Sequence, residues 1–141
     1  VLGTIDQLWD EYPNQLRLVI KQFPVHPQAE LAAEAALAAD AQGKFWELHD
    51  QMMANQDDLS RDALVGYAEA AGLDVARFGR ALDERSYRKA RLADQSAGQE
   101  IGVRGTPAFL INGRLITGAQ PIDEFRAMIE EELGRAAHAR R

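Results

Sequence analysis

The stretch GVRGTPAFLINGRLITG, residues 102–118, decides the fold of this chain. It contains two short apolar runs, residues 108–111 and 114–117, separated by Asn112-Gly113. Asn-Gly between two apolar runs predicts a β-hairpin, because both central residues of its two-residue turn need a positive φ. Thr106-Pro107 stands directly before the first run. A proline-containing loop is therefore expected to lead into the hairpin.

The composition is that of a globular protein and argues against several classes of function. The chain has 141 residues, which suits one domain, and its 46% hydrophobic and 27% charged residues are typical of a soluble globular protein. A net charge of -6 argues against a nucleic-acid partner, which needs a basic surface. No apolar run is long enough to span a membrane. The absence of cysteine excludes disulfides, thiolate catalysis and cysteine-based metal sites within these residues.

The first part of the chain predicts a helix followed by a strand. Residues 1–12 have helical apolar spacing and end before Pro13, since proline disfavours helix in the residue that precedes it. The predicted apolar face is Val1, Ile5, Leu8 and Trp9. Residues 16–23 are short, rich in branched side chains and closed by Pro24. They predict a largely buried strand.

A helical block separates that strand from the hairpin. Five helices are predicted: two within residues 27–56 that are separated at Gly43, one over 61–71 after Ser60, a short one after Asp74, and one over 86–100. A last helix follows Pro121. The strand and the hairpin can share a sheet only across this block. We therefore expect an α/β fold with a mixed sheet covered by helices.

The residues resemble a known family. Val103–Gly113 looks like the cis-proline loop and hairpin of DsbA-like thiol–disulfide oxidoreductases, which are thioredoxin-fold proteins with a helical insertion. Three further stretches agree, in the family's order: residues 23–27 (FPVHP), 41–50 (AQGKFWELHD) and 118–121 (GAQP). The resemblance therefore extends over nearly the whole chain.

The resemblance implies one thioredoxin-like domain over residues 1–141, with a helical insertion at about 28–100. It also implies that Gly105, Thr106 and Pro107 form a substrate loop with a cis Thr106–Pro107 bond, in which the Thr106 backbone pairs with an extended peptide. In the family this loop faces a Cys-x-x-Cys pair at the N-terminus of the first helix, where the helix dipole stabilises the thiolate. The first strand and this pair should precede Val1. The domain is thus expected to be truncated at its N-terminus and inactive as given, with no catalytic residue of its own.

The resemblance also carries expectations about partners. It implies extended protein or peptide substrates, no dissociable cofactor, and a bacterial protein working outside the cytoplasm, in the periplasm or cell envelope, where disulfides persist; a cytoplasmic location stays open. Without a first strand, residues 16–23 and 108–111 would leave backbone groups unpaired, which is costly in a buried region. If the chain is complete, we expect a homo-oligomer that closes this gap.

Two other functions stay open at this stage. The chain could be a non-catalytic thioredoxin-like module for peptide binding or assembly. It also shares its insertion architecture with kappa-type glutathione transferases and hydroxychromene carboxylate isomerases, whose serine nucleophile would also precede Val1.

The remaining polar and aromatic residues predict no further site. His26, His49 and His138 form no metal-ligand pattern with nearby carboxylates such as Glu30, Glu34, Glu47 and Asp50, so we expect polar or capping histidines and no metal. Phe45, Trp46 and the pair Met52-Met53 have helical spacing and are interpreted as core residues rather than as a peptide groove.

Overall fold

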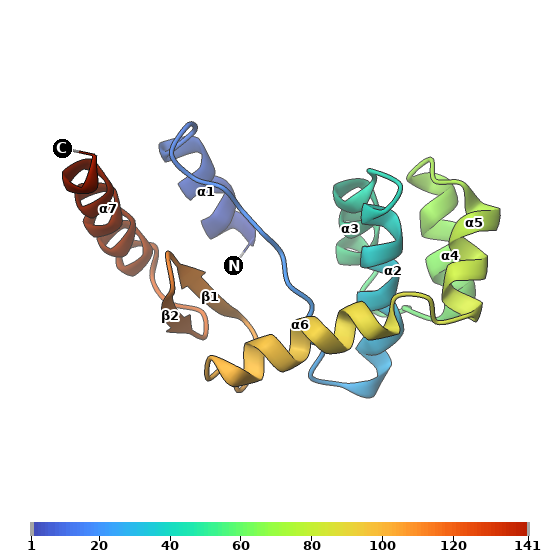
Figure 1. Cartoon of the computed structure of the whole chain (residues 1–141). Coiled ribbons are helices and arrows are strands. Elements are labelled where there is room, and N and C mark those ends of the chain that lie inside the picture. The colour runs from blue at the N-terminus through green and yellow to red at the C-terminus, as the bar shows by residue number, and fades with distance from the viewer. Residues whose placement is uncertain (1, 141) are drawn as a thin grey trace. The chain divides into compact units, whose positions relative to one another are not determined.

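The structure, a computed structural model, describes residues 2–140 and forms two compact units. The hairpin unit contains the chain up to Ile20 and from Val103 onward, and the helical unit contains Lys21–Gly102. The chain thus passes between the units twice, once after Ile20 and once after Gly102 (Figure 1). No helix within residues 2–140 is both long enough and apolar enough for a membrane span.

The hairpin unit consists of α1 (Leu2–Glu11), β1 (Ala108–Ile111), β2 (Arg114–Thr117) and α7 (Ile122–Ala139). The strands pair antiparallel, with Phe109 opposite Ile116. Asn112 and Gly113 have φ values of 49° and 87°, which confirms the turn predicted from the Asn-Gly pair. The helix after Pro121 is also confirmed, and it continues through the small, basic end of the chain.

The core of the hairpin unit is small and lies between α1, the hairpin and α7. Its buried members are Leu8, Tyr12, Ile116, Phe125 and Ile129. On the predicted apolar face of α1, Leu8 is buried, whereas the Trp9 side chain is 43% exposed. Val1, the other end of the predicted face, lies outside the described residues.

The strand predicted over residues 16–23 does not form. Within the described part of the chain the only sheet is the two-stranded β1–β2 hairpin, and residues 16–23 are extended without pairing to it. An isolated extended segment gains no backbone hydrogen bonds, and a strand exists only beside another strand. Within residues 2–140 the mixed sheet that the pattern of elements predicted is therefore not formed.

The helical unit contains the predicted block of helices. Its elements are a short 3₁₀ turn (Pro27–Ala29), α2 (Glu30–Asp40), α3 (Phe45–Ala54), α4 (Arg61–Ala70), α5 (Val75–Asp83) and α6 (Arg88–Glu100). The Ser60 side chain accepts a hydrogen bond from the Ala63 N–H and Asp74 accepts one from Arg77, as the N-cap predictions require. Gly43 ends its helix with a φ of 70°.

The core of the helical unit is continuous. Alanines of α2 and larger apolar residues of the other helices, among them Leu48, Leu64, Phe78 and Leu82, are buried together. Small alanine side chains allow α3 and α5 to approach α2 closely, so this unit buries an apolar centre without a sheet.

Candidate functional site

The loop before β1 has the geometry that the family resemblance implies. The Thr106–Pro107 peptide bond is cis. The Pro107 carbonyl accepts a hydrogen bond of 2.8 Å from the Gly118 N–H, which attaches the loop to the end of β2. Gly105 and Thr106 are exposed, whereas Pro107 is half-buried. Within residues 2–140 the backbone N–H and C=O of Thr106 have no backbone partner. These groups can therefore pair with another extended chain.

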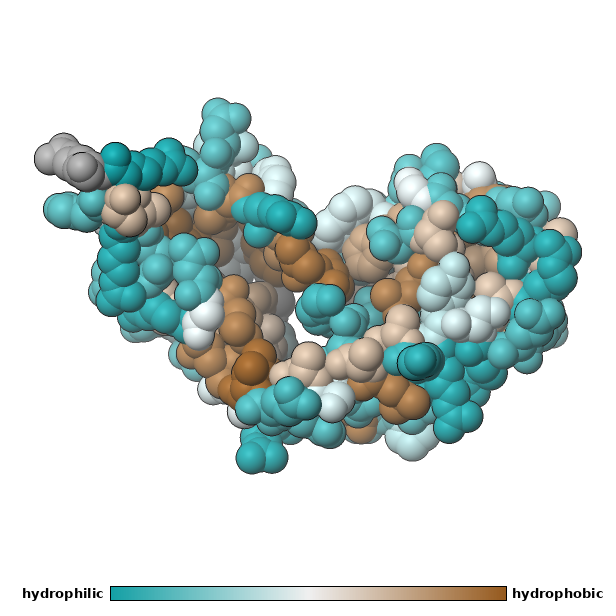
Figure 2. All heavy atoms as spheres, viewed as in Figure 1, coloured by the Kyte–Doolittle hydropathy of each residue, from teal (hydrophilic) through white to brown (hydrophobic). Residues whose placement is uncertain are grey.

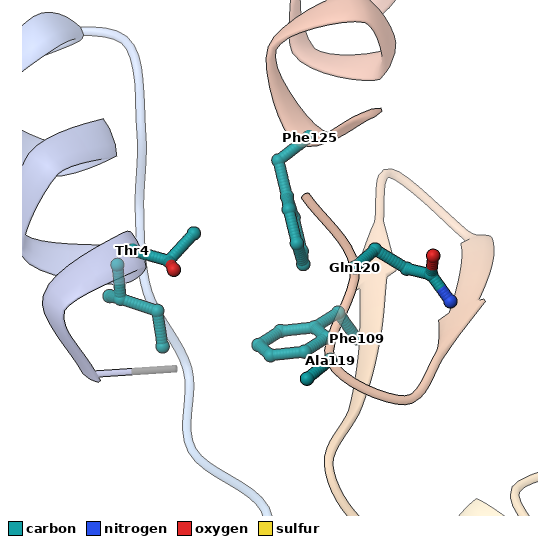
Figure 3. A pocket seen from close by; sticks show the side chains of 6 residues that line it. Thr4, Phe109, Ala119, Gln120 and Phe125 are labelled. Carbon is teal, nitrogen blue, oxygen red and sulfur yellow. The ribbon is translucent and has the colours of Figure 1, made fainter. Parts of the chain in front are cut away.

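A small cavity of about 40 Å³ lies beside β1. One of its lining residues, Phe109, follows the loop closely in the sequence. The cavity is lined by Thr4 and Ile5 of α1, Phe109 of β1, Ala119 and Gln120 after β2, and Phe125 of α7. The Phe109 and Phe125 rings meet edge to face with centroids 4.9 Å apart (Figure 3). The first turn of α1 therefore lies near the strand that begins directly after Pro107.

A larger open groove of about 370 Å³ lies at the other end of β1. Apolar side chains, among them Leu16, Ile111, Ile129 and Leu133, line it together with polar residues of the α1–Leu16 connection and of α7. Phe109 lines the small cavity and Ile111 lines the groove. The two residues are two positions apart in β1, so their side chains point to the same face of the hairpin. The space between β1 and the segment that starts at Leu16 is therefore incompletely filled.

Polar side chains hold α1 against α7. Hydrogen bonds from Arg126 keep the pKa of Glu11 below its ordinary value, although partial desolvation opposes them. The Tyr12 hydroxyl donates to Glu130 at 2.7 Å, and this bond, with burial adding to it, raises the pKa of Tyr12. These contacts join α1 and the residue after it to α7, the two helices that line the small cavity beside β1.

The comparison with protein families covers most of the chain. The family model described as "DSBA-like thioredoxin domain" matches residues 5–130, which include both units and the loop. The chain belongs to the DsbA-like thioredoxin domain family. The hairpin, the block of helices that precedes it and the final helix are elements expected from the resemblance.

The relatives of this DsbA-like domain include a thioredoxin-like oxidoreductase of known structure and proteins named as Na(+)/H(+) antiporters. It superposes on the crystal structure of a thioredoxin-like oxidoreductase from Silicibacter pomeroyi DSS-3 with a TM-score of 0.81 and 27% identity, covering 94% of this chain and 77% of the other. It is 40% identical over 129 residues to a Salinispora arenicola protein named Na(+)/H(+) antiporter NhaA 1. It is 34% identical over 128 residues to the Na(+)/H(+) antiporter NhaA of Herminiimonas arsenicoxydans. These matches cover 89% and 91% of this chain but only 20% and 21% of the antiporters, so the DsbA-like domain spans about a fifth of their length.

Two of the other family-like stretches of the DsbA-like domain lie in the helical unit, and GAQP, residues 118–121, lies in the hairpin unit between β2 and α7. The FPVHP stretch leads into the 3₁₀ turn, and AQGKFWELHD forms the connection from α2 to α3 together with the first part of α3. His49 stacks near Phe45 and lies 3.4 Å from Asp50, while His138 contacts the Gly134 carbonyl. Among residues 2–140 no group of three potential ligands could hold a metal ion. Met52 is buried in the core and Phe45 packs partly buried against it, as predicted, but Trp46 and Met53 are 48% and 39% exposed, so the prediction that they are core residues is wrong.

The sequence interpretation missed the principal polar cluster of the DsbA-like domain. Glu34 of α2 and Arg91 of α6 are 1% and 2% exposed and pair at 2.9 Å. Arg85 binds the same carboxylate with two hydrogen bonds of 2.6 and 2.8 Å. Burial alone would raise the pKa of Glu34, but the bonds from Arg85 and Arg91 outweigh burial and hold the pKa below its ordinary value. The one signal in the sequence was a lone glutamate within a run of alanines.

Proposed function

We propose that this DsbA-like domain presents an extended polypeptide to a redox dithiol during thiol–disulfide exchange. Gly105, Thr106 and Pro107 form the substrate loop. The observation that carries the proposal is the exposed Thr106 backbone, whose N–H and C=O have no backbone partner within residues 2–140. Such groups bind an extended chain by adding it as a strand, largely independently of its sequence.

The dithiol of the proposed reaction comes from outside these 141 residues, because they contain no cysteine. In the exchange a thiolate attacks one sulfur of a disulfide, forms a mixed disulfide and releases the other sulfur as a thiolate. The second thiol of the pair then resolves the mixed disulfide. The part of this chain in the reaction is to hold the substrate backbone while those sulfur atoms exchange.

The proposal is tested on the chain as it stands by titrating the ¹⁵N-labelled protein with an unstructured, disulfide-containing peptide. We expect shifts of the Gly105 and Thr106 amides and of the Ala108 amide after Pro107, and their loss when the peptide is N-methylated at the paired backbone position. Shifts confined to other regions would contradict the proposed loop. In an insulin-reduction assay the 141-residue chain is expected to be inactive, and a version preceded by a strand and Cys-x-x-Cys is expected to be active.

A second candidate is a non-catalytic binding or assembly module. It is favoured by the relatives named Na(+)/H(+) antiporter, in which the matched region is about a fifth of the whole. In that case the domain would be an accessory part of a larger membrane protein. The two candidates differ in one feature: a Cys-x-x-Cys ahead of this region supports exchange, and its absence supports the module.

Three further proposals accompany the function. The two units are parts of one thioredoxin-like domain, a reading supported by the family match that spans both. The domain works outside the cytoplasm, as the resemblance suggests. If no strand precedes this region, the free edge of β1 associates with a second copy. Sedimentation as a folded monomer of 15.6 kDa would contradict that association.

A further inference from the structure

The segment that enters the helical unit is held by side chains of one helix. The Gln22 N–H donates to Asp94 Oδ2 at 3.0 Å, and the Lys21 ammonium donates to Asp94 Oδ1 at 3.0 Å. The Gln95 side-chain amide donates to the Pro24 carbonyl at 3.4 Å. These three bonds join residues 21–24 to the middle of α6, more than 70 residues later in the sequence.

The same helix is itself fixed to the core of the helical unit. Arg91, one turn before Gln95, donates to the side-chain amide oxygen Oε1 of Gln95 at 3.2 Å and to Glu34 at 2.9 Å. It also donates to Glu30 at 3.1 Å. Gln95 thus uses its oxygen toward the buried arginine and its nitrogen toward Pro24. The entering segment is connected through Gln95 and Arg91 to the carboxylates of α2.

The other passage between the units also depends on this helix. α6 ends at Glu100, two residues before the chain leaves the helical unit after Gly102. We propose that α6 is the common anchor of both passages, with Asp94 and Gln95 acting as a latch that restrains the entering segment, residues 21–24. Since residues 21–24 directly follow the passage after Ile20, the latch limits the backbone freedom of the chain where it enters the helical unit.

Within the latch, the bond from the Gln22 N–H to Asp94 is the dominant contact. A hydrogen bond to a charged acceptor stabilises more than a neutral one, and Asp94 is largely shielded from water, with 15% of its side chain exposed. The Lys21 ammonium is 69% exposed, so its ion pair contributes little. The latch therefore acts on the backbone of the entering segment rather than through a surface salt bridge.

The test is amide hydrogen exchange and ¹⁵N relaxation on the intact chain. In Asp94→Ala we expect the Gln22 amide to exchange about tenfold faster, because it loses its charged acceptor. The order parameters of residues 21–23 are expected to fall from about 0.85 toward 0.6. Gln95→Ala is expected to lower the order parameters of the amides that flank Pro24 in the same sense but less. Lys21→Ala should change the exchange of Gln22 less than twofold.

The matched control is Glu100→Ala, which removes a carboxylate from the same helix without touching residues 21–24. Its Gln22 exchange should equal that of the original protein. An unchanged Gln22 amide in Asp94→Ala would overturn the latch. Equal acceleration of amides in α2 and α4 would also overturn it, because Asp94 would then support the whole unit rather than one segment.

Discussion

The helical unit and the hairpin unit complete their interiors to different degrees. In the helical unit, apolar residues of α2, α3, α4 and α5 form one continuous buried cluster. In the hairpin unit the buried cluster has only five members, and two cavities remain beside β1. A helix satisfies most of its backbone hydrogen bonds internally, whereas a strand depends on a neighbour. The difference shows that a block of helices can cover its own apolar centre, whereas the two-stranded hairpin leaves part of its apolar face uncovered.

Several apolar side chains of the hairpin unit are exposed, which also shows that its apolar residues are incompletely covered. Val19 is 57% exposed on the extended segment, and Leu110 and Leu115, opposite each other on the hairpin, are also exposed. Brown apolar surface is visible on this part of the molecule in Figure 2. Exposed apolar residues that lie together mark surfaces where another segment packs. This agrees with the proposal that an additional strand belongs beside β1.

The largest expected effect compares two buried phenylalanines. Phe78→Ala empties a closed core and should lower the free energy of unfolding of the helical unit by about 4 kcal/mol. Phe125→Ala should cost the hairpin unit only about 2 kcal/mol, because its ring already borders a cavity and the site is less well packed. Urea unfolding would be followed by Trp46 in a Trp9→Phe background and by Trp9 in a Trp46→Phe background, one reporter for each unit. Equal losses would contradict the difference in packing.

Acid should weaken the helical unit more than the hairpin unit. The pKa of Glu34 is lower in the folded protein than in the unfolded chain, so the unfolded chain takes up a proton first as the pH falls. The stabilisation is complete above about pH 4.5 and is lost as the pH drops toward the folded pKa. Glu34→Gln should cost about 3 kcal/mol near pH 7 and flatten this dependence. Urea titrations at pH 7, 5, 4 and 3 measure both, and the same acid slope in Glu34→Gln would disprove the assignment.

A smaller effect is expected at a helix cap. Ser60→Ala removes the acceptor for the Ala63 N–H and should destabilise the helical unit by about 1 kcal/mol. The Trp46 reporter should detect this change, whereas the Trp9 reporter should not. Ser96→Ala, at an exposed position within α6, is the control and should change stability by less than about 0.5 kcal/mol. A loss as large at Ser96 would show that the cap is not the cause.

The smallest effect is expected on the unpaired segment. Val19→Thr should change the stability of the hairpin unit by less than about 0.5 kcal/mol, because the side chain is mostly in water. A loss above about 1 kcal/mol in urea unfolding would mean that Val19 is covered in solution. That result would support the proposed association of the hairpin unit with a second copy, since only the hairpin unit would then need another chain to cover its apolar residues.

Local features of the fold could be predicted residue by residue. The Asn112-Gly113 turn, the caps at Ser60 and Asp74 and the stop at Gly43 depend on the backbone preferences of a few adjacent residues. The candidate loop could also be predicted from the sequence, because a short motif before a hairpin carries the family resemblance. These features need no information about distant parts of the chain.

What the sequence determined by itself is therefore the order of helices, the hairpin and the family, each from neighbouring residues. Only the tertiary structure decided that residues 16–23 form no strand, that Trp9 and Trp46 face water, and that Arg91 is buried against Glu34. The physical reason is the range of the interactions. A turn or a cap is completed within a few residues, whereas strand pairing, burial and ion pairs such as Arg91–Glu34 need partners that only the folded chain brings together.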